Sequence, residues 1–257
     1  ADPLESGYTF DYIVHGASGA NPKAFNETPV NVMMANFIGT MNYLEMCRAN
    51  PSTRFFFISS SEIYGENKIG IETIYEDMHG DIDCTQFRSC YPESKRASET
   101  LCASYKHQYG VDVVIARPAF IFGKNIINSN NRADVYFLRQ ALNKEDIRMY
   151  SRGEQIRSYC YINDCVTAML TILLNGESGE SYNIGNESCV VSLHDYAQAI
   201  ADAGGVQLLY QPETKPDGVT LLQTTRLVLG TGKLEDLGWK AQYTLEDGLN
   251  DIFRKKL

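Results

Sequence analysis

Short runs of β-branched and aromatic residues alternate with longer stretches of helical spacing in the first half of this 257-residue chain. This alternation is typical of parallel strands joined by crossover helices, so the sequence predicts an α/β fold with a parallel sheet. The run at 54–59 is almost continuously apolar, which indicates a strand covered on both faces. The expected strands are 11–15, 54–59 and 111–118, and the expected helices are 30–48 and 91–109.

The pattern becomes less regular after residue 123, where a polar, asparagine-rich loop begins. We therefore expect a sheet domain at 1–123 and a smaller lobe at 124–257, from which some segments return to the sheet. Ser192 and Thr244 each stand three residues before an aspartate, a pattern that predicts the start of a helix.

Composition and charge argue against several classes of protein. The 44% hydrophobic content allows a substantial core, and the net charge of -9 gives no electrostatic reason to expect nucleic acid as the main partner. No run approaches the roughly 18 apolar residues of a membrane span, and the first residues lack the features of a signal peptide. We expect a cytoplasmic protein whose partners are small molecules or like subunits, with no membrane partner.

The cysteines and histidines carry no metal or disulfide pattern. The seven cysteines include no CxxC pair, and their odd number argues against a complete disulfide framework. The four histidines form no HExxH motif and no zinc-ligand spacing. We expect reduced cysteines and no metal site.

Polar residues follow the expected strand at 54–59. Ser60, Ser61 and Glu62 stand at its carboxyl end, and open α/β sheets bind ligands outside the carboxyl ends of their strands. Farther along, Tyr91 and Lys95 are four residues apart, so on a helix they share one face. A neighbouring ammonium favours the phenolate form of a tyrosine, so this spacing predicts a tyrosine base whose pKa lies below its ordinary value.

Seven blocks, in order, resemble the extended short-chain dehydrogenase/reductases, in particular the NAD-dependent epimerase/dehydratase branch, which acts on nucleotide sugars. The likeness covers most of the chain, and seven ordered blocks are far more specific than any one of them. It implies a Rossmann-like parallel sheet with a smaller carboxyl-terminal substrate-binding lobe. The blocks are DYIVHGAS at 11–18, NFIGTMNYLE at 36–45, FFFISSSEIYG at 55–65, YPESKRASETLCASY at 91–105, IARPAFIFG at 115–123, GEQIRSYCYINDC at 153–165 and YNIGN at 182–186.

The resemblance implies a role for each matching residue. Tyr91 is expected to remove a sugar hydroxyl proton while hydride passes to NAD, Lys95 to hold the nicotinamide ribose, and Ser60 to hydrogen-bond the reacting hydroxyl. The candidate catalytic set is Ser60, Ser61, Glu62, Tyr91 and Lys95. The candidate NAD-binding set is Ala17, Ser18, Asn36, Ser59, Tyr91, Lys95 and Pro118, and the candidate substrate-binding set is Glu62, Phe120, Arg132, Tyr150 and Arg157.

The pair Ser61-Glu62 separates reactions within the family. The 4,6-dehydratases carry Asp-Glu at these positions, and a serine hydroxyl is a poor replacement for a carboxylic acid as proton donor. The Ser-Glu pair resembles UDP-glucuronate decarboxylases, with Glu62 near the carboxylate-bearing carbon and Arg157 near the charged groups of the substrate. Arg157 could instead form a surface or interlobe ion pair.

Three departures from the family pattern stand beside this resemblance. No GxGxxG spacing occurs in the chain, although the family places such a turn at the cofactor pyrophosphate and about three strands with their helices before 11–15. Phe120 and Lys124 replace a usual asparagine and proline, and Phe120 cannot donate the amide hydrogen bond expected there. The block YPESKR also lacks the glycine of the decarboxylase form YxxGKR.

Several functions therefore remain open at this point. The preferred one is UDP-glucuronate decarboxylation, and the alternatives within the enzymes are a nucleotide-sugar 4-epimerase or 4,6-dehydratase. A different class is a truncated, non-catalytic protein that binds a nucleotide sugar or a partner. We also expect a homodimer, because relatives associate through helices that resemble 30–48 and 92–109, and exposed sheet edges would favour association as well.

Overall fold

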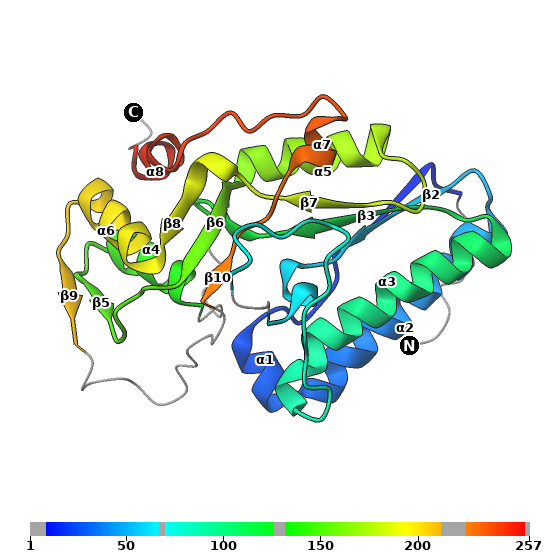
Figure 1. Ribbon diagram of the computed structural model, residues 1–257, viewed down its shortest axis with the longest axis horizontal. Coiled ribbons are helices and arrows are strands. Elements are labelled where there is room, and N and C mark those ends of the chain that lie inside the picture. The colour runs from blue at the N-terminus through cyan, green and yellow to red at the C-terminus, as the bar shows by residue number, and fades with distance from the viewer. Residues whose placement is uncertain (1–8, 67–69, 126–131, 212–224, 255–257) are drawn as a thin grey trace.

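The main sheet consists of four parallel strands. In the computed structural model, which describes residues 9–66, 70–125, 132–211 and 225–254, the strand order is β1-β2-β3-β7 (Figure 1). Consecutive strands pair in register, with Phe56 of β2 opposite Val14 on one side and Val114 on the other. The predicted parallel α/β fold is confirmed. The strands are β1 (Tyr12–His15), β2 (Arg54–Ile58), β3 (Asp112–Pro118) and β7 (Ser181–Ile184).

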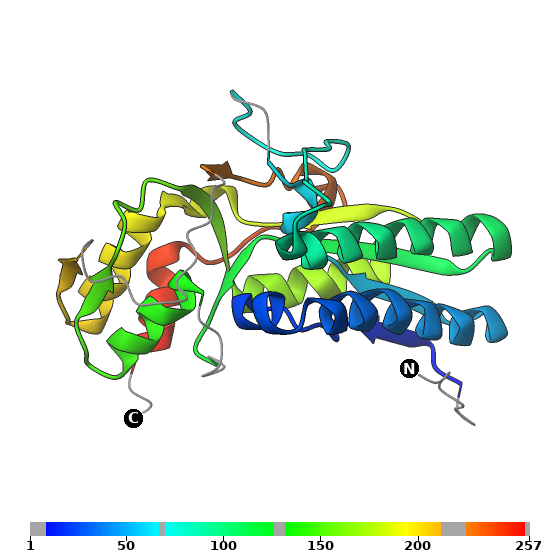
Figure 2. The same ribbon diagram turned by 90° about the horizontal axis from the view of Figure 1, so that it is seen from below.

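Helices cover both faces of this sheet. Figure 1 shows α2 (Pro29–Ala49) and α3 (Cys90–Tyr109) on one face and α5 (Ile162–Asn175) on the other, and Figure 2 shows α2 and α3 side by side. Alternate residues of β2 serve the two faces, as strand geometry requires: Phe55 and Phe57 pack with α2 and α3, and Phe56 packs with α5. This two-sided burial explains why the predicted strand is continuously apolar.

A second lobe lies at the left of Figure 1. Its central strand β6 pairs with β4 and β10 in parallel and with β8 in antiparallel orientation, while β5 and β9 form a separate parallel pair. Helices α4, α6 and α8 pack in its hydrophobic core. The elements are β4 (Phe120–Phe122), α4 (Ala133–Leu142), β5 (Ile147–Met149), β6 (Ile156–Tyr161), β8 (Val190–Ser192), α6 (Leu193–Gly204), β9 (Leu208–Tyr210), β10 (Arg226–Leu227) and α8 (Leu245–Phe253).

The chain passes between the two lobes more than once. β4 precedes residue 123 but pairs with β6, so the second sheet begins just before the expected boundary. α5 and β7 follow residue 123 but pack on and extend the main sheet, and α7 (Gly232–Glu235) contacts β7. The second lobe and the main sheet are thus joined by several chain crossings.

Local signals in the sequence explain several helix ends. The Ser192 and Thr244 hydroxyls accept hydrogen bonds from the backbone N–H groups of Asp195 and Asp247, so both predicted helix starts are confirmed. Gly110 ends α3 in the left-handed conformation, with φ of 73°, which favours glycine.

The short helix α1 (Pro22–Glu27) lies between the expected strand 11–15 and the expected helix 30–48, where the sequence predicted no helix. The Asn21 side chain accepts a hydrogen bond from the Ala24 N–H, and Pro22 occupies the first helical position. These two signals are sufficient for one helical segment although the preceding residues are rich in glycine and serine.

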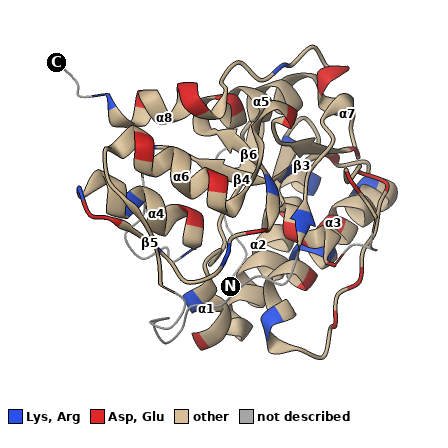
Figure 3. Cartoon of the chain, turned by 60° about the vertical axis from the view of Figure 1, so that its left-hand side comes forward, with Lys and Arg blue, Asp and Glu red and all other residues tan. Residues whose placement is uncertain are grey.

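No helix in the described ranges is long and apolar enough to cross a membrane. Figure 3 shows Asp and Glu residues on helices of both lobes, in keeping with the net charge of -9.

Candidate functional site

The segment after β2 forms a tight turn that orients the polar residues predicted there. Ser59 is buried and its N–H donates to the Ala116 carbonyl at 2.8 Å, which continues the sheet by one residue. Ser60 then caps the 3-10 helix η1 (Ser61–Tyr64), with its hydroxyl accepting from the Glu62 N–H at 3.1 Å. Ser61 is buried within this turn. The strand end thus presents Ser60 and Glu62 from one short, hydrogen-bonded turn.

Tyr91 and Lys95 lie in the first half of α3 and are both buried, as 7% and 2% of their surfaces are exposed. The Ser60 side chain lies close enough to the Tyr91 hydroxyl to lower its pKa, and the Phe25 ring stacks on the Tyr91 ring at a centroid distance of 4.9 Å. The Lys95 Nζ lies 5.9 Å from the Tyr91 ring centroid. The structure therefore brings together Ser60, Tyr91 and Lys95, which sequence spacing alone placed in two separate segments.

The ionisation of Tyr91 differs from the sequence-based expectation. Burial, together with the negative charge of Glu62, raises the pKa of Tyr91 to about 12, and the Ser60 side chain opposes this rise. The predicted lowering of the tyrosine pKa is wrong for this structure. Lys95 donates instead to the Ile58 carbonyl at 2.7 Å and lies 4.7 Å over the Phe57 ring.

Lys95 itself is a perturbed cation. Burial lowers its pKa to about 8, and the negative charge of Glu99, one turn farther along α3, opposes this effect. A buried ammonium held by a backbone carbonyl is a strong hydrogen-bond donor at neutral pH. Such a group can bind and orient hydroxyl groups of a ligand.

Glu62 is half-buried and lies near both Tyr91 and Arg88. Its carboxylate lies 3.4 Å from the Arg88 guanidinium, which in turn lies 4.4 Å over the Phe25 ring. Because Glu62 also raises the pKa of Tyr91, its carboxylate lies near enough to influence the phenol electrostatically. Arg88 and Phe25 were not singled out in the sequence, and no spacing rule marks them as neighbours of Glu62 and Tyr91.

Phe120, at the start of β4, forms a platform for two arginines. The Arg157 guanidinium lies 4.4 Å and the Arg132 guanidinium 5.0 Å from the Phe120 ring centroid, both within cation–π distance. Arg132 also pairs with the buried Asp134 at 3.2 Å. An asparagine has no aromatic ring and could not make these contacts. Phe120 therefore positions the two guanidinium groups in a way that the usual asparagine could not.

Arg157 is buried on β6, with 6% of its surface exposed. Its burial excludes a surface ion pair, and within the described ranges no Asp or Glu pairs with it; the interlobe ion pair stays an alternative interpretation. A buried arginine that lacks a carboxylate partner is costly unless an anion binds there. Arg157 is therefore the strongest candidate for an anion-binding residue in this part of the chain.

Tyr150 interacts with Tyr136 of α4. Burial, together with the hydrogen bond between these two tyrosines, raises the pKa of Tyr136 to about 12. Among the residues that the structure describes, no hydrogen bond or ring contact joins Tyr150 to Phe120 or Arg157. The Tyr150 assignment stays a prediction.

Three polar atoms of the candidate NAD-binding set are buried without a hydrogen-bond partner in the described part of the chain. They are Ser18 Oγ, Ser59 Oγ and Asn36 Oδ1, while Asn36 Nδ2 donates to Ser94 Oγ at 2.9 Å. Ser18 and Ser59 follow β1 and β2, and Pro118 ends β3, so these residues share the carboxyl edge of the sheet; Ala17, just before Ser18, is exposed. Unpaired buried polar atoms are rare in folded proteins, so these residues fit a polar ligand such as a dinucleotide.

Metal ligation receives no support from the described residues, which contain no group of three or more His, Cys, Asp or Glu arranged around a common point.

The comparisons with known proteins are consistent with this geometry. The model of the NAD dependent epimerase/dehydratase family matches residues 3–185. UDP-glucuronic acid decarboxylase 1 of Xenopus tropicalis is 32% identical over 252 residues, which are 96% of this chain and 58% of the frog protein. UDP-glucuronic acid decarboxylase 6 of Arabidopsis thaliana is 31% identical over 252 residues, 71% of its length.

Solved structures resemble the whole of this fold. A UDP-glucose 4-epimerase of Thermus thermophilus, in complex with NAD, has a TM-score of 0.80 at 25% identity, covering 96% of this chain and 78% of that one. A dTDP-glucose 4,6-dehydratase of Bacillus anthracis, also with NAD, has a TM-score of 0.75 at 20% identity, covering 95% and 71%. The chain spans between about half and four fifths of the length of the relatives it matches.

Proposed function

The chain belongs to the NAD dependent epimerase/dehydratase family, and on that premise we propose that it modifies a nucleotide sugar by NAD-dependent oxidation at sugar C4. The observation that carries the proposal is the contact between Ser60, at the carboxyl end of β2, and Tyr91, on α3, with Lys95 one turn away. A hydroxyl, a phenol and an ammonium at one sheet edge can bind a sugar hydroxyl and remove its proton.

In this mechanism Tyr91 removes the proton from the sugar hydroxyl while Ser60 holds that hydroxyl in place. NAD, when bound, supplies the hydride acceptor and returns the hydride at the end of the cycle. Lys95, Ser18, Ser59 and Asn36 would hold the cofactor, because they offer a buried cation and unpaired buried polar atoms at this edge.

The preferred reaction is decarboxylation of UDP-glucuronate. Oxidation at C4 gives a β-keto acid, which loses carbon dioxide, and the ketone is then reduced to the pentose. Glu62 would face the carbon that bears the carboxylate, and Arg157, on its Phe120 platform, would bind an anionic group of the substrate. Two relatives at 31–32% identity, both named UDP-glucuronic acid decarboxylases, support this choice.

A nucleotide-sugar 4-epimerase is the second candidate. It needs the Ser-Tyr-Lys arrangement and no carboxylic acid at position 61, where this chain has a buried serine. The same serine disfavours 4,6-dehydration, because that reaction needs a proton donor for the departing hydroxyl.

The experiment begins with calorimetric NAD binding by this chain and by a longer form extended at its amino-terminal side. We then expect release of carbon dioxide and formation of UDP-xylose from UDP-glucuronate by the form that binds NAD. Interconversion of UDP-glucose and UDP-galactose without loss of carbon dioxide would favour the epimerase. Failure of both forms to bind NAD or nucleotide sugar would contradict the enzymatic proposal, and nucleotide-sugar binding without turnover would favour a non-catalytic binding protein.

Glu62→Gln separates the two reactions at residue level. In a decarboxylase this change should abolish pentose formation while NADH absorbance still appears, whereas an epimerase should keep its product. Glu62 raises the pKa of Tyr91, so its replacement by Gln should lower that pKa. The pH dependence of the rate of NADH formation should therefore shift to lower pH. Glu154→Gln is the matched control, because that side chain is 80% exposed.

A further inference from the structure

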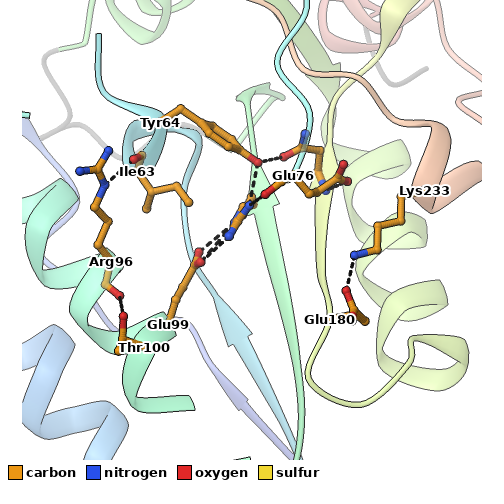
Figure 4. A network of polar contacts seen from close by, with 10 residues as sticks. Ile63, Tyr64, Glu76, Arg96, Glu99, Thr100, Glu180 and Lys233 are labelled. Carbon is orange, nitrogen blue, oxygen red and sulfur yellow. Dashed lines mark hydrogen bonds and ion pairs between the residues drawn. The ribbon is translucent and has the colours of Figure 1, made fainter. Parts of the chain in front are cut away.

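The turn that carries Ser60 and Glu62 is held at both of its ends by side chains of α3. Before the turn, Lys95 donates to the Ile58 carbonyl at 2.7 Å. After Glu62, the Arg96 Nε donates to the Ile63 carbonyl at 2.6 Å (Figure 4). Two consecutive residues of one helix thus fix the backbone on either side of Ser60 and Glu62.

A second arginine fixes the end of the same turn from β3. Arg117 Nη1 donates to the Tyr64 hydroxyl at 2.9 Å, and the Tyr64 hydroxyl donates to Asn183 Oδ1 at 2.6 Å. Glu99 of α3 pairs with Arg117 at 2.6 Å, and Figure 4 shows Glu99 and Tyr64 within this network. Tyr64 is fully buried, so the turn cannot shift without disturbing this hydrogen-bond network.

We propose that Arg96 and Arg117 are positioning residues that keep Ser60 and Glu62 at the working distance from Tyr91. The inference rests on the function proposed above and adds to it. Tyr91 and Arg96 belong to one helix. The proposed base and the guanidinium that holds the Ile63 carbonyl therefore move together as a rigid unit. Placing a site on a rigid element, with supporting hydrogen bonds, is how reacting groups are kept within a fraction of an ångström.

Arginine is needed at position 96 for a geometric reason. Besides the Ile63 carbonyl, its guanidinium donates from Nη2 to the Gly80 carbonyl at 2.7 Å, so one planar group joins the turn to a second loop. A lysine has a single ammonium on a flexible stem and cannot hold two separated carbonyls in a fixed plane. The positive charge is therefore less important than the fork of donors.

The test is Arg96→Lys, which keeps the charge and removes the fork. We expect kcat for nucleotide-sugar turnover to fall on the order of 10- to 100-fold, because small misplacements of reacting groups have effects of that size. KM for the nucleotide sugar and the dissociation constant of NAD should stay within about two-fold, because in this proposal Arg96 contacts neither the sugar nor the cofactor. Arg152→Lys, at a side chain that is 80% exposed, is the control.

A second readout does not need turnover. Hydrogen exchange at the amides of residues 61–65 should become on the order of 10-fold faster in Arg96→Lys and also in Tyr64→Phe, which removes the hydroxyl held by Arg117 without altering any charge. If the wild-type chain turns over no nucleotide sugar, the proposed function fails and the exchange comparison alone decides this inference. Unchanged exchange in both variants, unchanged kcat in an active enzyme, or a rise of KM alone would overturn it.

Discussion

At the residue scale, the sequence proposed candidate site residues that the structure brings together, but it did not identify their hydrogen-bond partners. Ser60, Tyr91 and Lys95 follow from a strand end and an i, i+4 spacing, which are local patterns. The hydrogen bond from Lys95 to Ile58 joins residues 37 positions apart, and that from Arg117 to Tyr64 joins residues 53 apart. No local rule connects such pairs. The burial of Tyr91 near Glu62, which raises the tyrosine pKa, is likewise a tertiary property.

One signal for the buried network was present in the sequence. Arg117 directly follows the apolar run VVIA within the expected strand, and a charge buried in a sheet needs a partner. The partner, Glu99, lies on α3 and is identified only once the helix packs on the strand. The sequence can thus indicate that an ion pair exists without naming its second member.

Arg157→Met should separate binding from stability. The change removes a buried cation that has no carboxylate partner among the described residues, so the melting temperature should stay equal or rise. KM for the nucleotide sugar should rise on the order of 10- to 100-fold, because a charged hydrogen-bond donor to the substrate is lost. Thermal melts and steady-state kinetics measure the two effects, with Arg152→Met as the exposed control. A lowered melting temperature with unchanged KM would contradict the anion-binding role.

At the element scale, the hydrophobic period predicted the central strands and helices to within one or two residues. The expected strand 11–15 is Tyr12–His15, and the expected helix 30–48 is Pro29–Ala49. The short elements after residue 123 were less predictable, because three-residue strands such as Val190–Ser192 carry too few residues to establish a period. Their pairing with β6 is a tertiary property.

The packing of β1 against α2 contains a buried histidine that should make stability depend on pH. His15 is 2% exposed and lies among Tyr43, Phe55 and Phe57, and burial, together with the charge of Lys95, lowers its pKa to about 4. The folded chain therefore binds this proton less readily than the unfolded chain, whose histidine has a pKa near 6.5. This contribution to stability is complete above pH 6.5 and is lost as the pH falls towards 4.

His15→Phe should remove that dependence. We expect the difference in unfolding free energy between variant and wild type to change by on the order of 3 kcal/mol between pH 7 and pH 4, in favour of the variant at low pH. Urea unfolding at several pH values measures this difference. His107→Phe, at an exposed position of α3, is the control and should show no comparable change. Parallel pH profiles for wild type and His15→Phe would contradict the assignment.

At the scale of the whole molecule, exposed apolar side chains gather on several elements of the described part of the chain, and these elements compete as sites of association. One is the outer face of α2, with exposed Val30, Met33, Met34, Phe37 and Met41. On α5, Ile162, Val166, Leu170 and Leu174 are exposed at helical spacing, and Tyr12 and Val14 are exposed on the edge strand β1. Exposed apolar patches and unpaired edges both favour association, so the fold alone does not choose between them.

We expect a homodimer formed through the α2 face. The residues of that face recur at helical spacing along one long helix, so two copies can bury it by helix packing across a two-fold axis. Phe37→Glu should then give a monomer in sedimentation velocity at micromolar concentration, because it places a charge in the middle of the buried face. Leu170→Glu, a matched apolar-to-acidic change on α5, should leave the dimer intact. If Leu170→Glu is monomeric and Phe37→Glu is still a dimer, association takes place through α5 and not through α2. A monomeric wild type would contradict both kinds of dimer.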